Sequence, residues 1–197
     1  MSDEENVLHR LVVFGGDGAA GKTSLFLHRM GRLPAVYIPT KVDYLRNAYL
    51  INGKTVVVNF SDYEGGGEDW WALRHLGYGS ADCVVLCFEI YRDNLDYIKD
   101  YWYPFTKKYC PKAKRILVGT KKDERDNKEL IERLANHGER LATYEEGEEL
   151  SKEIKAECYL ECSTVTGEGV EDVFNKAAEV ASTVYIDHDV RRKCCII

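Results

Sequence analysis

The segment GDGAAGKT, residues 16–23, restricts the fold of this chain more than any other. It has the spacing G-x-x-x-x-G-K-T, follows an apolar, β-branched run at residues 7–15, and precedes a run of helical character at residues 22–30. In that context glycines let backbone N–H groups approach phosphates, Lys22 reaches the β- and γ-phosphates, and the Thr23 hydroxyl can bind Mg²⁺. The segment predicts a phosphate-binding loop whose nucleotide contacts are Gly16, Gly18, Ala19, Ala20, Gly21, Lys22, Thr23 and Ser24. The motif alone leaves both ATP and GTP open.

Strand and helix patterns alternate along the rest of the chain. The dipeptide Asn52-Gly53, a strong hairpin signal, separates two strand-like segments at residues 43–51 and 54–60. Further strands are predicted at residues 82–90, 115–120 and 158–162, and helices at residues 92–109, 127–138, 144–156 and 170–181. This order predicts an α/β fold of the P-loop type, with a six-stranded, mainly parallel sheet, one antiparallel hairpin edge, and helices on the flanks.

Three features of the helical segments are specific enough to compare with a structure. We expect Pro104 to bend or end the helix at residues 92–109, because its ring clashes with the preceding turn. The charged helix at residues 127–138 has Leu130, Ile131 and Leu134 on one side, which favours a surface excursion over a core element. The last helix has an apolar face formed by Val170, Val173, Phe174, Ala177 and Ala181.

The composition favours one cytosolic domain. A chain of 197 residues suits a single domain, which we place at residues 7–184 between a flexible leader and a flexible tail at residues 185–197. The net charge of -6 argues against nucleic acid as a general partner. No apolar signal segment precedes the first strand, and Cys83 and Cys87 fall in an apolar run, so reduced thiols are favoured over disulfides. The histidines have no metal-ligand spacing, and the apolar runs are too short to span a bilayer.

Two polar segments that follow predicted strands bear on the choice of base. They are TKKD, residues 120–123, and ECST, residues 161–164. A carboxylate at Asp123 can accept hydrogen bonds from guanine N1–H and N2–H₂, whereas adenine offers no such donor pair. TKKD by itself is a common solvated charge cluster, but together with the phosphate loop it selects guanine. A P-loop ATPase or nucleotide kinase would have no reason to carry it.

From Val7 to the C-terminus these motifs resemble the Ras-like small GTPases, and specifically their Rho/Rac branch. GDGAAGKT is similar to the Rho-type phosphate loop, and YIPT, residues 37–40, is similar to switch I. TKKDERDN and the extra helical segment resemble the Rho insert, at about residues 124–140, and the closing CCII resembles a prenylation box. The resemblance implies a guanine-nucleotide switch that binds GTP and GDP with Mg²⁺ and signals to effectors of the actin and cell-polarity type.

The same resemblance assigns roles to single residues. Thr40 would join Thr23 on the metal in the GTP state, and Asp62 would hold the metal through water. Lys121 would pack along the base, and the loop at Ser163 and Thr164 would contact guanine O6. The nucleotide-binding set is completed by Leu33, Tyr37, Gly65, Gly66 and Thr120. Implied partners are effectors, an exchange factor, a GTPase-activating protein and a GDP-dissociation inhibitor, all acting on a monomer.

The segment DYEGGGED, residues 62–69, departs from the family pattern D-T-A-G-Q-E, whose glutamine orients the attacking water. Alignment of LRHLGY with the usual L-R-x-L-x-Y leaves one extra residue, so the glutamine position falls on a glycine, Gly67 if Glu68 keeps its register. Glu64 stands where a small apolar residue normally lies beside the γ-phosphate, and a carboxylate there can repel it. We expect weak or absent hydrolysis. The open alternative is that Glu64 or Glu68 positions the water.

These departures leave two hypotheses about function. In one the chain is a slow GTPase, with Lys22 and an arginine from a partner assisting the reaction. In the other it is a GTP-loaded scaffold that does not hydrolyse. Leu33 replaces an aromatic residue that covers guanine in the family, which predicts faster nucleotide release unless Tyr37 or another aromatic ring covers the base instead. Trp70 and Trp71 are either an anchor for effectors or regulators, or buried against the third helix.

The C-terminal tail predicts reversible membrane attachment. Arg191, Arg192 and Lys193 precede Cys194, which the Cys-a-a-X pattern marks as a lipidated thiol. Isoleucine at the last position does not decide between a farnesyl and a geranylgeranyl group. One lipid chain beside three basic residues is a modest membrane anchor. We therefore expect the protein on the cytoplasmic face of the plasma or internal membranes, together with a cytosolic pool. An unmodified end is the alternative.

Overall fold

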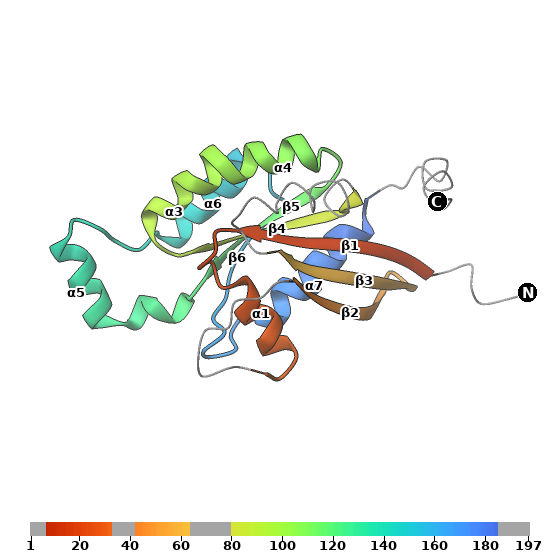
Figure 1. Cartoon of the computed structure of the whole chain (residues 1–197), viewed down its shortest axis with the longest axis horizontal. Coiled ribbons are helices and arrows are strands. Elements are labelled where there is room, and N and C mark those ends of the chain that lie inside the picture. Colours follow the sequence, from red (N-terminus) through yellow and green to blue (C-terminus); the bar gives the residue numbers. More distant parts are fainter. Residues whose placement is uncertain (1–6, 33–41, 64–79, 185–197) are drawn as a thin grey trace, which may run out of the picture.

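A computed structural model of the chain describes residues 7–32, 42–63 and 80–184, and its centre is a six-stranded sheet (Figure 1). The strand order is β2-β3-β1-β4-β5-β6, and only the β2–β3 pair is antiparallel. The strands are β1 (Val7–Gly16), β2 (Val42–Ile51), β3 (Lys54–Tyr63), β4 (Cys83–Glu89), β5 (Lys114–Thr120) and β6 (Tyr159–Glu161). The predicted mainly parallel sheet with one hairpin edge is confirmed.

Helices cover both faces of the sheet (Figure 1). On one face lie α3 (Arg92–Tyr97), α4 (Tyr103–Tyr109) and α6 (Tyr144–Glu153), and on the other lie α1 (Lys22–Arg29) and α7 (Val170–Ser182). The core under α1 and α7 contains four packed phenylalanine rings, and the core under α3 and α6 contains Leu86 and Trp102. The central strands are buried on both faces, which explains their continuous apolar sequences. All five predicted apolar residues of α7 are fully buried.

The predicted hairpin turn is confirmed by its backbone. Asn52 and Gly53 have φ values of 51° and 74°, which is the left-handed region that a two-residue type I′ turn requires at both positions. The register continues on each side of the turn, from Ile51 opposite Lys54 to Val42 opposite Tyr63. The turn therefore fixes which residues of β3 lie at the carboxyl ends of the parallel strands.

The helical path does not end at Pro104. A π-helical turn, η3 (Ile98–Trp102), joins α3 to α4, and Pro104 occupies the first turn of α4. Proline lacks the N–H that an interior helical position would donate, so a turn with altered hydrogen bonding accommodates it without breaking the helix. The turn keeps Trp102 in the core, 2% exposed, and stacks Tyr97 and Tyr101 with ring centroids 5.1 Å apart on the surface.

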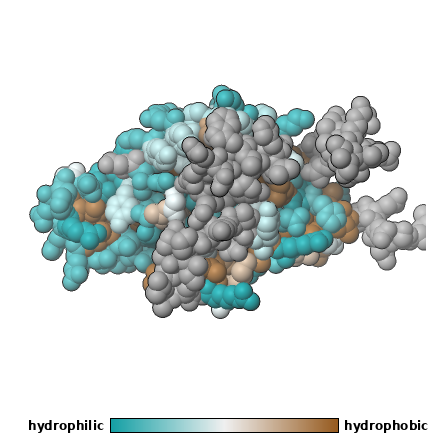
Figure 2. Space-filling model, in the orientation of Figure 1, coloured by the Kyte–Doolittle hydropathy of each residue, from teal (hydrophilic) through white to brown (hydrophobic). Residues whose placement is uncertain are grey.

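The insertion after β5 begins with a 3-10 turn, η4 (Lys122–Asp126), and continues as α5 (Lys128–Asn136), which stands at one end of the molecule (Figure 1). Leu130 and Leu134 are each 5% exposed, but Ile131 is 42% exposed. The expectation that all three share one face is therefore wrong, because Ile131 adjoins Leu130 in sequence and falls about 100° further round the helix. Figure 2 shows hydrophobic atoms among hydrophilic ones at this end.

The described cysteines, Cys83, Cys87, Cys110, Cys158 and Cys162, are free thiols. Burial raises the pKa of Cys110 and of Cys162 to about 12, so these thiols stay protonated at neutral pH. No helix among the described residues has the length and apolar character needed to cross a membrane.

The α6 helix begins with a capping box and ends at Glu153, three residues earlier than Ala156, because Lys155 takes a left-handed conformation with φ 54°. In the capping box Glu146 accepts a hydrogen bond from the Thr143 backbone N–H at 2.9 Å and pairs with Arg140. The Arg140 guanidinium, followed by that N–H, lowers the pKa of Glu146 from its ordinary 4.5 to about 2.

Replacing Glu146 with glutamine is expected to reduce the free energy of unfolding at pH 7 by about 1 kcal/mol or less, because Glu146 is partly exposed and solvent screens its charge. A lowered folded-state pKa stabilises the fold above the unfolded value, and that contribution disappears as the pH falls from 4.5 towards 2. Urea unfolding at pH 7 and at pH 3 would measure it, with Glu149→Gln on the same helix as the control. A Glu146→Gln effect that is equally large at both pH values would contradict this account.

Candidate functional site

The phosphate loop lies between the end of β1 at Gly16 and the start of α1 at Lys22. The Lys22 side chain is buried, and its Nζ donates to the carbonyl oxygens of Gly16 at 3.0 Å and Asp17 at 2.6 Å. Gly21 caps α1 with φ 73°, and no side chain accepts a hydrogen bond there. The N-terminus of α1 therefore offers its first-turn N–H groups, with the Lys22 ammonium beside them, and this arrangement suits an anion.

Thr23 and Asp62 form an oxygen pair beside this loop. The Thr23 hydroxyl donates to Asp62 Oδ2 at 2.6 Å, and Asp62, near the end of β3, is 2% exposed. Hydroxyl and carboxylate oxygens are ligands that suit Mg²⁺, which usually completes its shell with waters and phosphate oxygens. The described residues hold no group of three or more His, Cys, Asp or Glu that could cage a metal by themselves. The pair therefore fits Mg²⁺ bound together with a phosphate ligand.

Asp123 is held in place by the loop after β6. The Ser163 hydroxyl donates to Asp123 Oδ1 and accepts from the backbone N–H groups of Val165 and Thr166, both at 3.1 Å. Ser163 is only 1% exposed, so its hydroxyl is used inside the protein and orients the carboxylate. The family resemblance implies that the loop at Ser163 and Thr164 contacts guanine O6. In the structure the Ser163 side chain itself contacts Asp123.

Thr120 connects the phosphate loop to the loop that carries Asp123. Its hydroxyl lies 3.1 Å from the carbonyl oxygens of both Ala20 and Phe88, and the residue is 3% exposed. The side chain is thus directed into the protein, where it joins the phosphate loop, β4 and β5. We assign it the role of holding the two halves of the site together.

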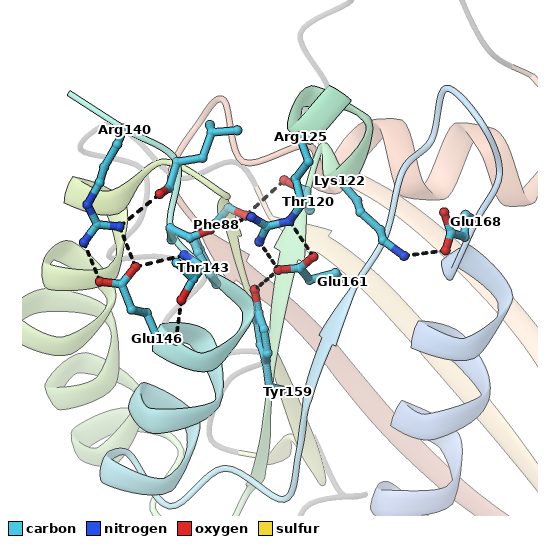
Figure 3. A network of polar contacts seen from close by, with 12 residues as sticks. Phe88, Thr120, Lys122, Arg125, Arg140, Thr143, Glu146, Tyr159, Glu161 and Glu168 are labelled. Atoms are coloured by element: carbon cyan, nitrogen blue, oxygen red, sulfur yellow. Dashed lines mark hydrogen bonds and ion pairs between the residues drawn. The ribbon is translucent and has the colours of Figure 1, made fainter. Parts of the chain in front are cut away.

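A polar network joins the turn after β5, which carries Asp123, to β6 and the loop that follows β6 (Figure 3). Glu161, whose side chain is 4% exposed, accepts hydrogen bonds from Arg125 Nε at 3.1 Å and from the Tyr159 hydroxyl at 2.7 Å. Burial and the bond to Glu161 raise the pKa of Tyr159, so its hydroxyl remains a donor. Lys122 and Glu168 form a further pair between the two loops. Sequence reasoning missed this network, in which Arg125 and Glu161 are 36 residues apart and Lys122 and Glu168 are 46 residues apart.

These residues lie around the carboxyl ends of the parallel strands of the sheet. The parallel strands β1, β3, β4, β5 and β6 end at Gly16, Tyr63, Glu89, Thr120 and Glu161. In open α/β sheets ligands bind outside these carboxyl ends.

The sequence profile of the Ras family matches residues 10–183 of the chain. The chain belongs to the Ras family. It is therefore a small GTPase of the nucleotide-binding switch class, and the α/β fold expected for a small G domain is confirmed.

Two further contacts of this Ras-family site had no place in the sequence prediction. Glu89, at the end of β4, forms an ion pair with Lys121. His28 Nδ1 lies 3.1 Å from the Thr164 carbonyl oxygen, a hydrogen bond that requires the Nδ1–H tautomer. A carboxylate at the end of a buried parallel strand is a signal that could have pointed to Glu89, because ligands bind at that edge. His28 offers no comparable signal.

Nine predicted site residues of this Ras-family chain lie outside the described residues, and their roles stay predictions. They are Leu33, Tyr37, Thr40, Glu64, Gly65, Gly66, Gly67, Glu68 and Cys194, and the same holds for Trp70 and Trp71.

Proposed function

We propose that this Ras-family protein is a Rho-type guanine-nucleotide switch that binds GTP and GDP with Mg²⁺ and hydrolyses GTP slowly. The observation that carries the proposal is the Asp123 carboxylate, oriented by Ser163 and joined to the phosphate loop through Thr120. The helical insertion after β5 supports the Rho-type assignment, since the resemblance to that branch includes an extra helix at this place.

The residues of the phosphate loop, Asp123 and the Thr23–Asp62 pair each have a defined task in this proposal. The Lys22 ammonium and the backbone N–H groups of the phosphate loop bind the phosphates, and Asp123 accepts hydrogen bonds from guanine N1–H and N2–H₂. Thr23 and Asp62 would hold the metal, and the family resemblance adds Thr40 in the GTP state. When bound, Mg²⁺ neutralises charge on the phosphate oxygens.

Slow hydrolysis rests on the sequence of switch II. A glycine at position 67 has no side chain with which to orient water, and Glu64 takes the sequence position of a small apolar residue that lies beside the γ-phosphate in the family, where a carboxylate would repel that phosphate. A chain with the phosphate and base loops in place but no water-orienting residue would stay GTP-bound and signal to effectors until a partner arginine or nucleotide exchange intervenes. The second candidate, a GTP-loaded scaffold without any hydrolysis, is favoured by the same two residues.

Single-turnover hydrolysis of radiolabelled GTP is the test. We expect Gly67→Gln to hydrolyse GTP at least about tenfold faster than wild type, because a correctly placed side chain then positions the water. Gly66→Gln is the matched control, since it adds the same side chain one position away. Wild-type turnover at a rate typical of Ras-family GTPases that carry the glutamine would contradict slow hydrolysis and direct attention to Glu64 and Glu68. No turnover by wild type would favour the scaffold.

We also propose that Cys194 carries a prenyl group and that the protein resides on the cytoplasmic face of membranes with a cytosolic pool. The proposal rests on the Cys-a-a-X pattern and the three preceding basic residues. Effectors, an exchange factor, a GTPase-activating protein and a GDP-dissociation inhibitor are the partner classes that a monomeric switch of this branch would use. An unmodified intact mass for protein isolated from prenylating cells would refute the lipid anchor.

A further inference from the structure

Glu89 and Lys121 approach each other from two neighbouring strands. Glu89 is the last residue of β4 and stands opposite Thr120, the last residue of β5, and Lys121 follows directly. Their side chains form an ion pair in which the Glu89 side chain is 15% exposed and the Lys121 side chain 41% exposed. The pair is therefore shielded on its acidic side and open to solvent on its basic side.

The backbones that carry both side chains are fixed. The Glu89 carbonyl oxygen accepts hydrogen bonds from the Tyr91 N–H at 2.6 Å and from Asn94 Nδ2 at 3.1 Å. Lys121 adopts a left-handed conformation with φ 61°, and its carbonyl oxygen accepts from the Glu124 N–H at 2.9 Å. With both backbones held, the ion pair decides where the long Lys121 side chain lies.

Glu89 also borders the phosphate loop. It lines a cavity of about 60 Å³ together with Asp17, Ala19 and Ala20 of that loop. A carboxylate in this place, left without its cation, would repel bound phosphates, and a nearby ammonium removes most of that effect. Lys121 is thus placed to neutralise Glu89, and Glu89 is placed to direct Lys121 across the site.

We propose that Glu89 is a positioning residue for nucleotide binding: it holds Lys121 against the base, and Lys121 in return neutralises Glu89 beside the phosphate loop. The inference rests on the proposed function, in which Lys121 packs along guanine. It requires that the two residues act as a coupled unit, so the effects of replacing them cannot be additive.

The test is a double-mutant cycle on release of a fluorescent GDP. We expect Lys121→Ala to release GDP about tenfold faster than wild type, because the base loses its cover and Glu89 is left unneutralised. Glu89→Gln alone should release it about threefold faster, because Lys121 loses its guide. In the Lys121→Ala background the same Glu89→Gln change should instead slow release, since it removes the uncompensated carboxylate.

A second readout separates positioning of Lys121 from general support of the loop. Inosine diphosphate lacks the N2 amino group that Asp123 is expected to bind, whereas Lys121 would contact the face of either base. Glu89→Gln should therefore speed release of both nucleotides by the same factor and leave their ratio unchanged. Glu153→Gln is the matched control, because Glu153 pairs with Lys99 at 2.7 Å between α6 and η3, away from the site.

Two results would overturn the inference. One is an equal effect of Glu89→Gln in the wild-type and Lys121→Ala backgrounds. The other is a GDP-to-inosine-diphosphate ratio that collapses in Glu89→Gln, which would mean that the Asp123 loop itself has been disturbed. A wild-type protein that binds neither nucleotide would refute the proposed function and this inference with it. Wild-type binding with a purely additive cycle would refute only the inference.

Discussion

Replacing Asp123 with asparagine is expected to weaken GDP binding by about a hundredfold and to shift the base preference towards xanthine. The carboxylate can accept from two guanine donors, and a hydrogen bond to a charged group contributes about 1.5–3 kcal/mol. Asparagine offers one acceptor and a donor that faces the guanine amino group. Xanthine carries an oxygen in place of that amino group, so the amide can donate to it. Displacement of fluorescent GDP by GDP, xanthosine diphosphate and ADP would measure the change.

The control for this prediction is Ser163→Ala, which removes the hydroxyl that orients Asp123 but keeps the carboxylate. It should weaken GDP binding by about tenfold, equivalent to about 1.4 kcal/mol, without favouring xanthine. Displacement by ADP as effective as displacement by GDP, in the wild type, would end the guanine assignment. Loss of GDP binding in Asp123→Asn with no gain for xanthine would point to a disturbed loop in place of an altered base contact.

Local patterns were sufficient to predict the fold. The mainly parallel sheet follows from the alternation of strand and helix segments, and the Asn52-Gly53 turn sets the register of the antiparallel β2–β3 pair. The π-helical turn before Pro104 was not predicted, because the sequence shows only the cost of a proline in a regular helix and not the altered hydrogen bonding that accommodates it. The exposure of Ile131 was missed because Ile131 adjoins Leu130 in sequence but points about 100° further round α5, away from the buried side formed by Leu130 and Leu134.

The candidate site was predictable only where the chemistry is local. The phosphate loop is contiguous, so its spacing identifies Lys22 and Thr23 directly. The supports of Asp123 and Lys121 come from Ser163 and Glu89, 40 and 32 residues away. These contacts depend on which strand lies next to which and in what register, and periodicity alone does not supply that information.

The two glycines at the end of β1 should differ sharply in their tolerance of alanine. Gly16 has φ 136°, and a Cβ there would lie 2.1 Å from the backbone oxygen of Cys87 on β4. Gly15 shows no such backbone conformation, and its Cβ would make an ordinary contact with Trp102 at 3.5 Å. Gly16→Ala must therefore either push β4 away from β1 or distort the start of the phosphate loop, whereas Gly15→Ala needs neither.

We expect Gly16→Ala to lower the free energy of unfolding by about 3–5 kcal/mol, from overpacking and from a backbone conformation that alanine avoids, and Gly15→Ala by less than about 1 kcal/mol. Thermal unfolding measures the loss of stability in each variant. The stoichiometry of GDP binding, taken well below the melting temperature, measures distortion of the phosphate loop, because Lys22 Nζ donates to the Gly16 carbonyl oxygen. Equal stability of the two variants would mean that β1 and β4 separate easily at this point. Gly16→Ala protein that is folded but binds no GDP would place the damage in the loop, which is where strain at Gly16 should appear if the sheet resists.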